Sequence, residues 1–332
     1  MTIQVQRYKT CCLILNWNRW QLTLECLDSL RLLTHLPSTL LVCDNSSEDD
    51  SSERILDWGH VHFAPSDILY LSPSSKIKKR VDGKIPSFVF IQSPENLGFA
   101  GGNNLGLQWA LVQNSYDFFW LLNNDTMVDH KALDSLLACS EKNPDVGIWG
   151  STICWPDAPD VVQCAGGCQY FPLTSIFRPI FSGKKRDELQ DVEPKRIDYI
   201  LGASLLARKE VFQKIQLLNE DYFLFYEELD FCLRAQKAGF SLGWCQPSFV
   251  YHHGSASIGT AKSADRAQLQ KSVYHENLST LKFTRKHYPW YLPIAMIFRF
   301  IGKGFFLIMR RQTYLLPSLL RAYRDFLFKN AG

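Results

Sequence analysis

A group of oxygen-bearing side chains ends a strongly apolar run near the middle of the chain. Residues 120–122 are Trp-Leu-Leu, and Asn123, Asn124 and Asp125 follow directly. Asparagine and aspartate are poor strand formers and good turn formers, so one interpretation is a simple turn. The other is that a buried strand delivers amide and carboxylate oxygens, which suit Mg²⁺ or Mn²⁺, to a fixed point in a cleft.

Two further segments carry side chains that could act with this group. Glu227, Glu228 and Asp230 stand at the start of a predicted helix, and His252 ends a predicted strand. Acidic residues are favoured in a first helical turn by the helix dipole alone, so chemistry is one of two explanations for them. If Asp125, Glu228 and His252 face one cleft, they suit a divalent cation whose coordination a substrate diphosphate completes.

The common nucleotide-binding loops are missing from the sequence. There is no GxxxxGK[ST] segment, and no GxGxxG follows the first predicted strand. The glycine-rich segment 98–104 (GFAGGNN) follows the third strand and has neither spacing. Cys164 and Cys168 lack the second pair that a zinc site needs. A nucleotide with a metal-bridged diphosphate is therefore the better expectation.

The elements that would position these side chains alternate between strands and helices. Four apolar runs, at 11–15, 39–44, 87–92 and 117–122, are separated by helical patterns, as in a parallel sheet covered by helices. Asn18, Asp44, Asn96 and Asp125 come just past these strands. Each alone could be a turn former or a helix cap. Because ligands of open α/β sheets bind outside the carboxyl ends of the strands, we expect the four to line one cleft.

The composition fits a globular protein of one or two domains. Of 332 residues, 46% are hydrophobic and 21% charged, which allows a core and argues against disorder. The net charge of +3 is too small to predict a nucleic-acid partner. The N-terminal segment MTIQVQRYKT is polar and several cysteines lie in apolar runs, so we expect a cytoplasmic location.

Six segments in order along the chain resemble the family 2 inverting glycosyltransferases, in particular a bacterial rhamnosyltransferase-like branch. Each segment is weak alone, but six in the right order over roughly residues 9–257 are specific. They are LNWNR (15–19), VCDNSSED (42–49), ENLGFAGGNN (95–104), LLNNDT (121–126), FLFYEELDFCLR (223–234) and VYHHGSAS (250–257). The resemblance implies a GT-A fold, in which a mixed α/β sheet flanked by helices binds a nucleotide sugar beside an acceptor half.

The resemblance implies which residues contact the nucleotide sugar. Asp44 matches the acid that commonly hydrogen-bonds the pyrimidine base. The donor-binding set matched in this way is Asn16, Asn18, Asp44, Asn96, Gly98, Gly101, Asn103, Asn123 and Asn124.

It also implies a metal site for Mg²⁺ or Mn²⁺. Asn123-Asn124-Asp125 stands where the family has a DXD metal motif, with asparagine in place of the first acid. Asp125 is the acid that remains, and the loss of the first carboxylate is expected to lower the metal affinity. His252 matches a histidine that binds metal in some members, and His253 is the weaker choice.

The resemblance also implies catalytic roles for the acidic residues at the start of the predicted helix. Glu228 stands at the position of the base, where Asp is commoner, and Glu227 is its neighbour beside the acceptor hydroxyls. Asp230 belongs to the same motif but, two residues away on a helix, points elsewhere than Glu228. The implied reaction transfers a sugar, with inversion, from dTDP-rhamnose or a UDP-sugar. The implied acceptor is a hydroxyl of a glycan or lipid-linked molecule in cell-surface polysaccharide synthesis.

The second half is less regular. We expect residues 60–86 to form a solvated insertion and 151–198 to form long loops, which could cover the acceptor side. A helix is predicted from 103 to 114 and a strand passing into a helix at 198–212. The helix that carries Glu228 should end at Gly239.

Residues 288–332 differ in composition, and we separate this segment from a catalytic domain at 1–287. Arg299 and Lys303 interrupt its apolar run, so a true membrane span is not expected. Trp290 and Tyr291 with many basic residues suit an amphipathic helix pair at a membrane interface, on the inner face of a plasma membrane. The basic set is Arg299, Lys303, Arg310, Arg311, Arg321 and Arg324. The alternative is packing against the catalytic domain or against another subunit of a homo-oligomer.

Two other functions remain open. A nucleotidyltransferase would also use a nucleotide and acidic metal ligands on an α/β sheet, but it normally has a basic glycine-rich loop after the first strand, where this chain has LNWNRW. A non-catalytic sugar-binding relative would fit the loss of the first DXD acid, and donor hydrolysis would argue against it.

Overall fold

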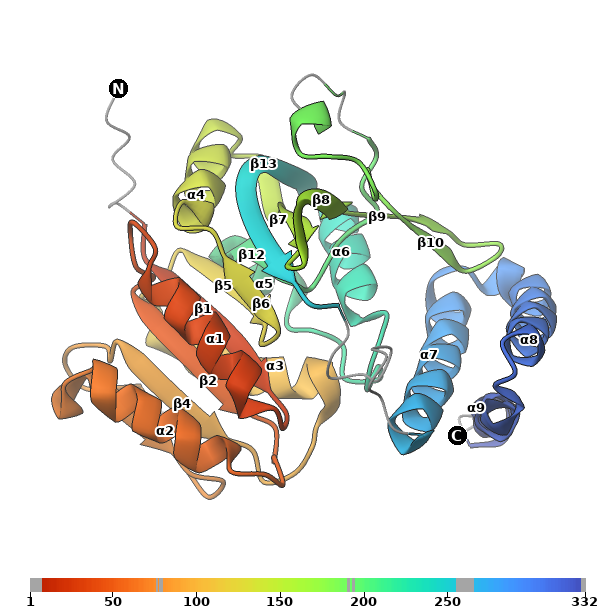
Figure 1. Cartoon of the computed structure of the whole chain (residues 1–332), viewed down its shortest axis with the longest axis horizontal. Coiled ribbons are helices and arrows are strands. Elements are labelled where there is room, and N and C mark those ends of the chain that lie inside the picture. The colour runs from red at the N-terminus through yellow and green to blue at the C-terminus, as the bar shows by residue number, and fades with distance from the viewer. Residues whose placement is uncertain are drawn as a thin grey trace.

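The protein is built on a mixed sheet of ten strands in the part of the chain that the structure describes (Figure 1). The structure is a computed structural model, and it describes residues 8–75, 77, 80–189, 192, 195–254 and 266–329. Residues 255–257 of the last recognised segment, and most of the basic stretch 76–80, therefore lie outside the described residues. The strand order is β3-β4-β2-β1-β5-β12-β7-β13-β6, and β8 pairs with β7. The strands are β1 (Thr10–Asn16), β2 (Thr39–Asp44), β3 (Ile68–Leu71), β4 (Phe88–Gln92), β5 (Phe118–Asn123), β6 (Thr126–Val128), β7 (Val146–Trp155), β8 (Ala158–Ala165), β12 (Ser204–Arg208) and β13 (Ser241–His252).

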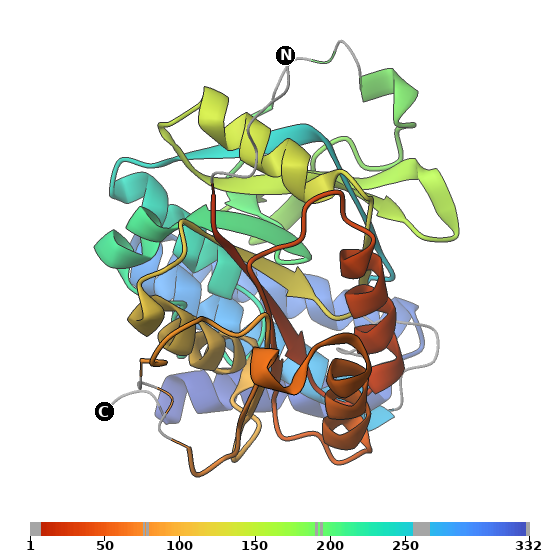
Figure 2. The same ribbon diagram turned by 90° about the vertical axis from the view of Figure 1, so that its left-hand side faces the viewer.

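Helices cover both faces of this sheet, as the predicted alternation requires. Figure 2 shows α1 and α2 on one side of the strands and α3, α5 and α6 on the other. The helices are α1 (Trp20–Arg31), α2 (Ser51–His62), α3 (Gly98–Gln113), α4 (Ala132–Lys142), α5 (Lys209–Ile215), α6 (Glu227–Lys237), α7 (Arg266–His287), α8 (Leu292–Met309) and α9 (Leu316–Phe328). The central strands β1, β2, β4 and β5 pair in parallel and are almost wholly buried. Their continuous apolar runs reflect burial on both faces.

Two regions that were expected to be irregular contain strands in the structure. Within 60–86, β3 pairs in parallel with β4 as an edge strand. Within 151–198, β7 extends to Trp155, β8 pairs with it, and β9 (Gly167–Phe171) and β10 (Ile176–Pro179) form a small second sheet with β11 (Tyr199–Ile200). Proline and glycine in these regions favoured loops in the sequence. Edge strands tolerate proline, so these residues did not prevent strands from forming. Helix α3 begins at Gly98, five residues earlier than the predicted start at 103.

The last three helices pack together around a core of their own. Helix α7 contacts both α8 and α9, and Figure 1 shows it between the sheet and α8. The shared core residues are Val273, Leu281, Leu307, Leu315, Leu319, Tyr323 and Phe326. Because α7 precedes residue 287, this packing crosses the predicted domain boundary, which stays a prediction.

Candidate active site

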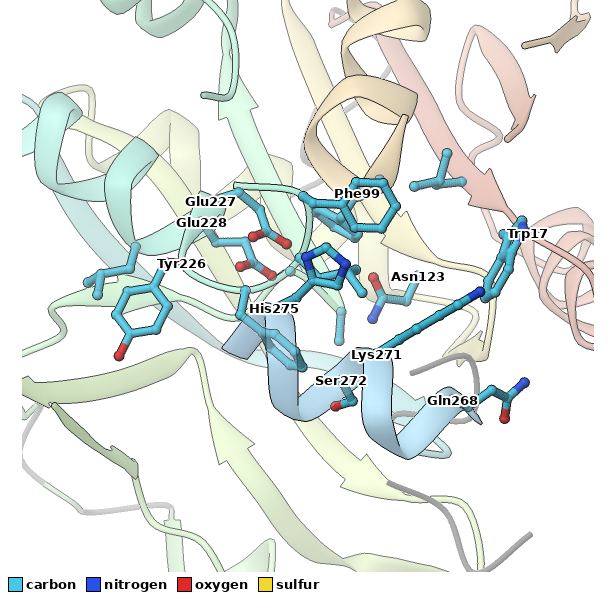
Figure 3. Close-up of a pocket in the computed structure, with 18 of the residues that line it drawn as sticks. Trp17, Phe99, Asn123, Tyr226, Glu227, Glu228, Gln268, Lys271, Ser272 and His275 are labelled. Atoms are coloured by element: carbon cyan, nitrogen blue, oxygen red, sulfur yellow. The ribbon is translucent and has the colours of Figure 1, made fainter. Parts of the chain in front are cut away.

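A cavity of about 960 Å³ opens at the carboxyl ends of β1 and β5. Its size lies within the range of small-molecule sites. Eight residues predicted from the sequence line it: Asn96, Gly98, Asn123, Asn124, Asp125, Glu227, Glu228 and His252. Figure 3 shows Glu227 and Glu228 on one side of this pocket and Trp17 on the opposite side. The strand-end argument therefore brought together side chains that are far apart in the sequence.

Asn16 and Asp44 lie beneath the pocket in a buried network. The Asn16 side-chain amide donates to Asp44 Oδ1 at 2.7 Å, and the Ser47 hydroxyl donates to the same oxygen. The Thr23 hydroxyl donates to Asn16 Oδ1 at 2.6 Å, and the Asn124 amide donates to Thr23 at 3.1 Å. Asp44 is fully buried. Its visible role is to fix the ends of β1 and β2, and the predicted contact with a nucleotide base stays a prediction.

Three other predicted donor contacts also lie outside the pocket lining. Asn18 accepts a hydrogen bond from the Glu48 amide at 2.9 Å and shapes the turn after β1. The Asn103 amide donates to the Phe99 carbonyl at 3.0 Å within α3, and a Cβ at Gly101 would meet Leu97. Asn103 and Gly101 therefore make their visible contacts within the region of α3, and the predicted donor contacts of all three residues stay predictions.

Asn45, which the sequence reasoning did not single out, holds the start of α3 at the pocket. Its side-chain amide donates to Asn96 Oδ1 at 3.1 Å and to the Gly98 carbonyl at 3.0 Å, and its Oδ1 accepts from the Leu97 amide at 2.9 Å. Gly98 has a φ of +71°, and a Cβ there would lie 2.2 Å from the Phe223 carbonyl oxygen. The signal was available, because Asn45 directly follows Asp44 at a strand end.

Asp125 and His252 form the candidate metal centre. Asp125 Oδ1 lies 3.3 Å from His252 Nε2, and both residues are buried. His252 Nδ1 lies 2.8 Å from Gln163 Oε1, which can only accept. Gln163 therefore places the ring proton on Nδ1 and directs Nε2 toward Asp125, as an outer partner does for a metal-binding histidine. His253 is exposed, and its backbone amide donates to the Asp125 carbonyl at 3.1 Å.

The carboxylate pair at the start of α6 is unusually costly to ionise. Burial raises the pKa of Glu228 to about 7, against the opposing effect of backbone hydrogen bonds from Glu228 itself and Gly202. Burial, and then the charge of Glu228, raise the pKa of Glu227 well above its ordinary value. Glu227 Oε2 has no hydrogen-bond partner among the described residues. Phe225 and Tyr226, just before the pair, both have left-handed backbone conformations, which are uncommon for such side chains. A carboxylate whose pKa lies near neutrality is suited to general base catalysis.

Comparison with known proteins gives the family of the chain. The model of the family "Glycosyl transferase family 2" matches residues 11–215. The chain belongs to glycosyltransferase family 2. The match covers more than half of the chain. It includes the carboxyl ends of β1 and β5, at which the pocket opens.

Two curated relatives are similar to this family member over much of their length. The low-salt glycan biosynthesis hexosyltransferase Agl10 of Haloferax volcanii is 26% identical over 208 residues, which are 59% of this chain and 64% of that protein. The chain thus spans slightly less than two thirds of that relative. The N-acetylglucosaminyl-diphospho-decaprenol L-rhamnosyltransferase of Mycobacterium tuberculosis is 23% identical over 256 residues, covering 75% of this chain and 77% of that protein.

Solved structures support the GT-A fold. The mannosyltransferase PcManGT from Pyrobaculum calidifontis, in complex with GDP-Man and Mn²⁺, has a TM-score of 0.54 at 12% identity and covers 98% of this chain and 88% of its own. TarS 1–349 of S. aureus, in complex with UDP-GlcNAc, has a TM-score of 0.54 at 14% identity. It covers 96% of this chain and 80% of its own. At these identities the likeness shows the fold alone.

Asp230 of this family member does not line the pocket. It is fully buried and lies 2.6 Å from Arg234 Nε, 2.9 Å from Lys286 Nζ and 2.7 Å from His287 Nε2. Burial acts to raise the pKa of Asp230, but the His287 hydrogen bond and the Arg234 charge outweigh it and hold the pKa well below its ordinary value. This position makes Asp230 an anchor between α6 and α7, and its predicted catalytic role stays a prediction.

One wall of the pocket was missed by sequence reasoning. Residues of α7 and α9 form it, including Lys271, His275 and Arg321 (Figure 3 shows Lys271 and His275). Lys271 Nζ lies 6.0 Å from the centre of the Trp17 ring. Burial, and then the charges of Lys282, Lys271 and Arg321, lower the pKa of His275 to about 4. No local motif marks α7, so only the fold reveals this basic wall.

Proposed function

We propose that the protein is an inverting glycosyltransferase that uses a nucleoside-diphosphate sugar, dTDP-rhamnose or a UDP-sugar, as donor. The acceptor is a hydroxyl of a glycan or lipid-linked molecule. The names of the hexosyltransferase and rhamnosyltransferase relatives support the reaction class, and the family assignment favours it over the nucleotidyltransferase alternative. A cytoplasmic location is part of the same proposal.

The carboxylate pair carries this proposal. Glu228 and Glu227 share one pocket with Asp125 and His252, and Glu228 has a pKa of about 7. Near neutral pH a substantial fraction of Glu228 is therefore ionised and able to accept a proton. It removes the proton of the acceptor hydroxyl while that oxygen bonds to the anomeric carbon. The bond from this carbon to the diphosphate oxygen breaks on the opposite face, so the configuration inverts.

The donor set around Asp125 fits a divalent cation bound with the donor substrate. A carboxylate and an imidazole converge there, and Asn123 Oδ1 is buried with no hydrogen-bond partner among the described residues. Within those residues no group of three His, Cys, Asp or Glu side chains could hold a metal by itself. Asp125 and His252, with Asn123, would hold Mg²⁺ or Mn²⁺, whose remaining ligands come from the donor diphosphate and water. Such a cation, when bound, offsets the negative charge of the departing diphosphate.

Ligand-dependent melting tests the proposal. A ligand that binds only the folded state raises the melting temperature by mass action. We expect one pyrimidine nucleotide sugar, in a panel of UDP-, dTDP- and GDP-sugars, to raise it by several degrees, and Mn²⁺ to increase the effect. The increase with Mn²⁺ should disappear in Asp125→Asn and persist in Asp129→Asn, which changes an aspartate nearby in sequence but outside the pocket lining. No change with any nucleotide sugar would contradict the proposal.

A further inference from the structure

Helix α8 exposes an apolar surface that nothing in the described chain covers. It lies on the far side of α7 from the sheet (Figure 1). By length and composition the stretch Pro289–Met309 could cross a membrane, and only 11% of it is buried. A continuous strip of large side chains is exposed, consisting of Ile294, Ile297, Phe298, Ile301, Phe305 and Ile308. Such a surface on a protein in water marks an interaction site.

The two cations within α8 do not face outward. Arg299 and Lys303 both pair with the carboxylate of Glu276 on α7, and the Lys303 Nζ to Glu276 Oε2 distance is 2.7 Å. Their side chains are only 11% and 21% exposed. Of the basic residues predicted for a membrane interface, these two therefore face α7 instead of the outer surface of α8. Their neutralisation by Glu276 leaves an outer face of α8 that carries apolar side chains alone along this strip.

The width of the apolar surface indicates which partner fits it. Phe300 and Phe306 are also exposed, on either side of the strip. At 3.6 residues per turn, the exposed apolar positions cover roughly two-thirds of the helix circumference. A seam between two helices uses a narrower stripe, so a second copy of this helix would leave much of the surface in water. A lipid phase, which surrounds a helix from several sides, covers it better.

The ends of α8 carry the residues that favour a membrane interface. Trp290, just before the helix, is 91% exposed, and Tyr291 beside it is also exposed. Arg310 and Arg311 follow the helix and are exposed as well. Tryptophan and tyrosine prefer the headgroup level, and arginines attract anionic lipids.

We propose that the exposed face of α8 is immersed in the surface of an anionic lipid bilayer. The helix lies along the bilayer rather than across it, because its opposite face stays bound to α7 through Arg299, Lys303 and Glu276. If the proposed function holds, this contact also brings the pocket close to a lipid-linked acceptor. Helix α7 forms a wall of the pocket with Lys271 and His275 and supports α8 with Glu276, so the pocket lies one helix away from the lipid.

Vesicle flotation of the full chain tests the proposal. The probe is vesicles of equimolar phosphatidylcholine and phosphatidylglycerol. We expect the wild-type protein to float with them, and Ile297→Glu/Ile301→Glu to bind at least about tenfold more weakly, because charged side chains are costly in hydrocarbon. Arg310→Gln/Arg311→Gln should lose roughly tenfold on these vesicles and little on pure phosphatidylcholine. The matched control is Leu32→Glu/Val61→Glu, which alters residues that are 75% and 76% exposed at the ends of α1 and α2 and should bind like wild type.

Three results would overturn the proposal. The first is a wild-type protein that does not float, and the second is equal binding by the α8 variant and its control. The third is a wild-type dimer in light scattering that the α8 substitutions dissociate while vesicles capture neither form, which would make α8 an interface between two copies. Nucleotide-sugar melting curves of the same variants should be unchanged, so failure here is distinguishable from failure of the proposed function.

Discussion

Replacing Glu228 by glutamine should greatly slow transfer and stabilise the protein at the same time. Glutamine keeps the size of the side chain and an oxygen that can accept from the Gly202 amide, but it cannot take a proton from the acceptor. A general base typically contributes a factor of about 10² to 10⁴, so we expect a fall in kcat of that order. Binding of the donor should change little, because in the proposed reaction Glu228 acts on the acceptor hydroxyl and not on the donor.

The gain in stability follows from the pKa of Glu228. Burial raises it from 4.5 to about 7, which corresponds to up to about 3 kcal/mol of unfavourable ionisation in the folded state. The folded state binds the proton more tightly than the unfolded state. Stability from this group is therefore full below pH 4.5 and is lost as the pH rises through 7. Glu228→Gln removes this loss, so its advantage over wild type should be up to about 3 kcal/mol near pH 8 and small near pH 4.

Urea unfolding at the two pH values measures this difference, with Glu210→Gln on the exposed surface of α5 as the matched control. Transfer by the wild type should also fall about tenfold per pH unit below pH 7, as the base becomes protonated. A Glu228→Gln variant that transfers sugar at the wild-type rate would refute Glu228 as the base. A stability advantage that is absent, or the same at both pH values, would refute the burial argument.

Other parts of the site predict further outcomes. Gly202→Ala would place a Cβ 2.2 Å from Glu228 Oε1, a flexible side-chain end, so kcat should fall by roughly a hundredfold with little loss of stability in urea unfolding. Gln163→Leu and His252→Ala should raise the Mn²⁺ concentration needed for half-maximal activity by about 10- to 100-fold, whereas His253→Ala, at an exposed site, should not. Asp230→Asn should cost about 3 kcal/mol at pH 7, because it leaves buried cationic partners uncompensated. Since the pKa of Asp230 is held well below 3.8, its stabilising effect is present above that pH and is lost in stronger acid, so the difference between Asp230→Asn and wild type in urea unfolding should shrink steadily as the pH falls below 3.8.

The parallel half of the fold could be predicted because its signals are local. Strands buried on both faces are continuous apolar runs, and their polar ends fall at one edge by topology alone. This logic placed Asn96, Asp125 and His252 in one pocket before any contact was known. Asn18 and Asp44, the other two strand-end residues, do not line the pocket, because a strand-end side chain can join a hydrogen-bond network next to a cleft as readily as it can face the cleft.

The other features of the fold depend on contacts between residues that are distant in the sequence. Strand β12 inserts antiparallel between β5 and β7, and β8 pairs with β7, through register choices that no short segment determines. The partner of Arg299 and Lys303 is Glu276, on a helix for which the sequence offered no motif. Without that partner, the two cations looked like interruptions of an apolar helix. With it, they form the inner face of α8.

The proposed reaction in this pocket is an inverting displacement with Glu228 as base. The most direct measurement is proton NMR of the sugar that the enzyme releases from its nucleotide donor when water replaces the acceptor, recorded before the anomers equilibrate. We expect the first-formed anomer to be opposite to that of the donor, Mn²⁺ or Mg²⁺ to accelerate its release, and Glu228→Gln to suppress it. Release of the same anomer as in the donor would contradict an inverting displacement, and undiminished release by Glu228→Gln would contradict Glu228 as the base.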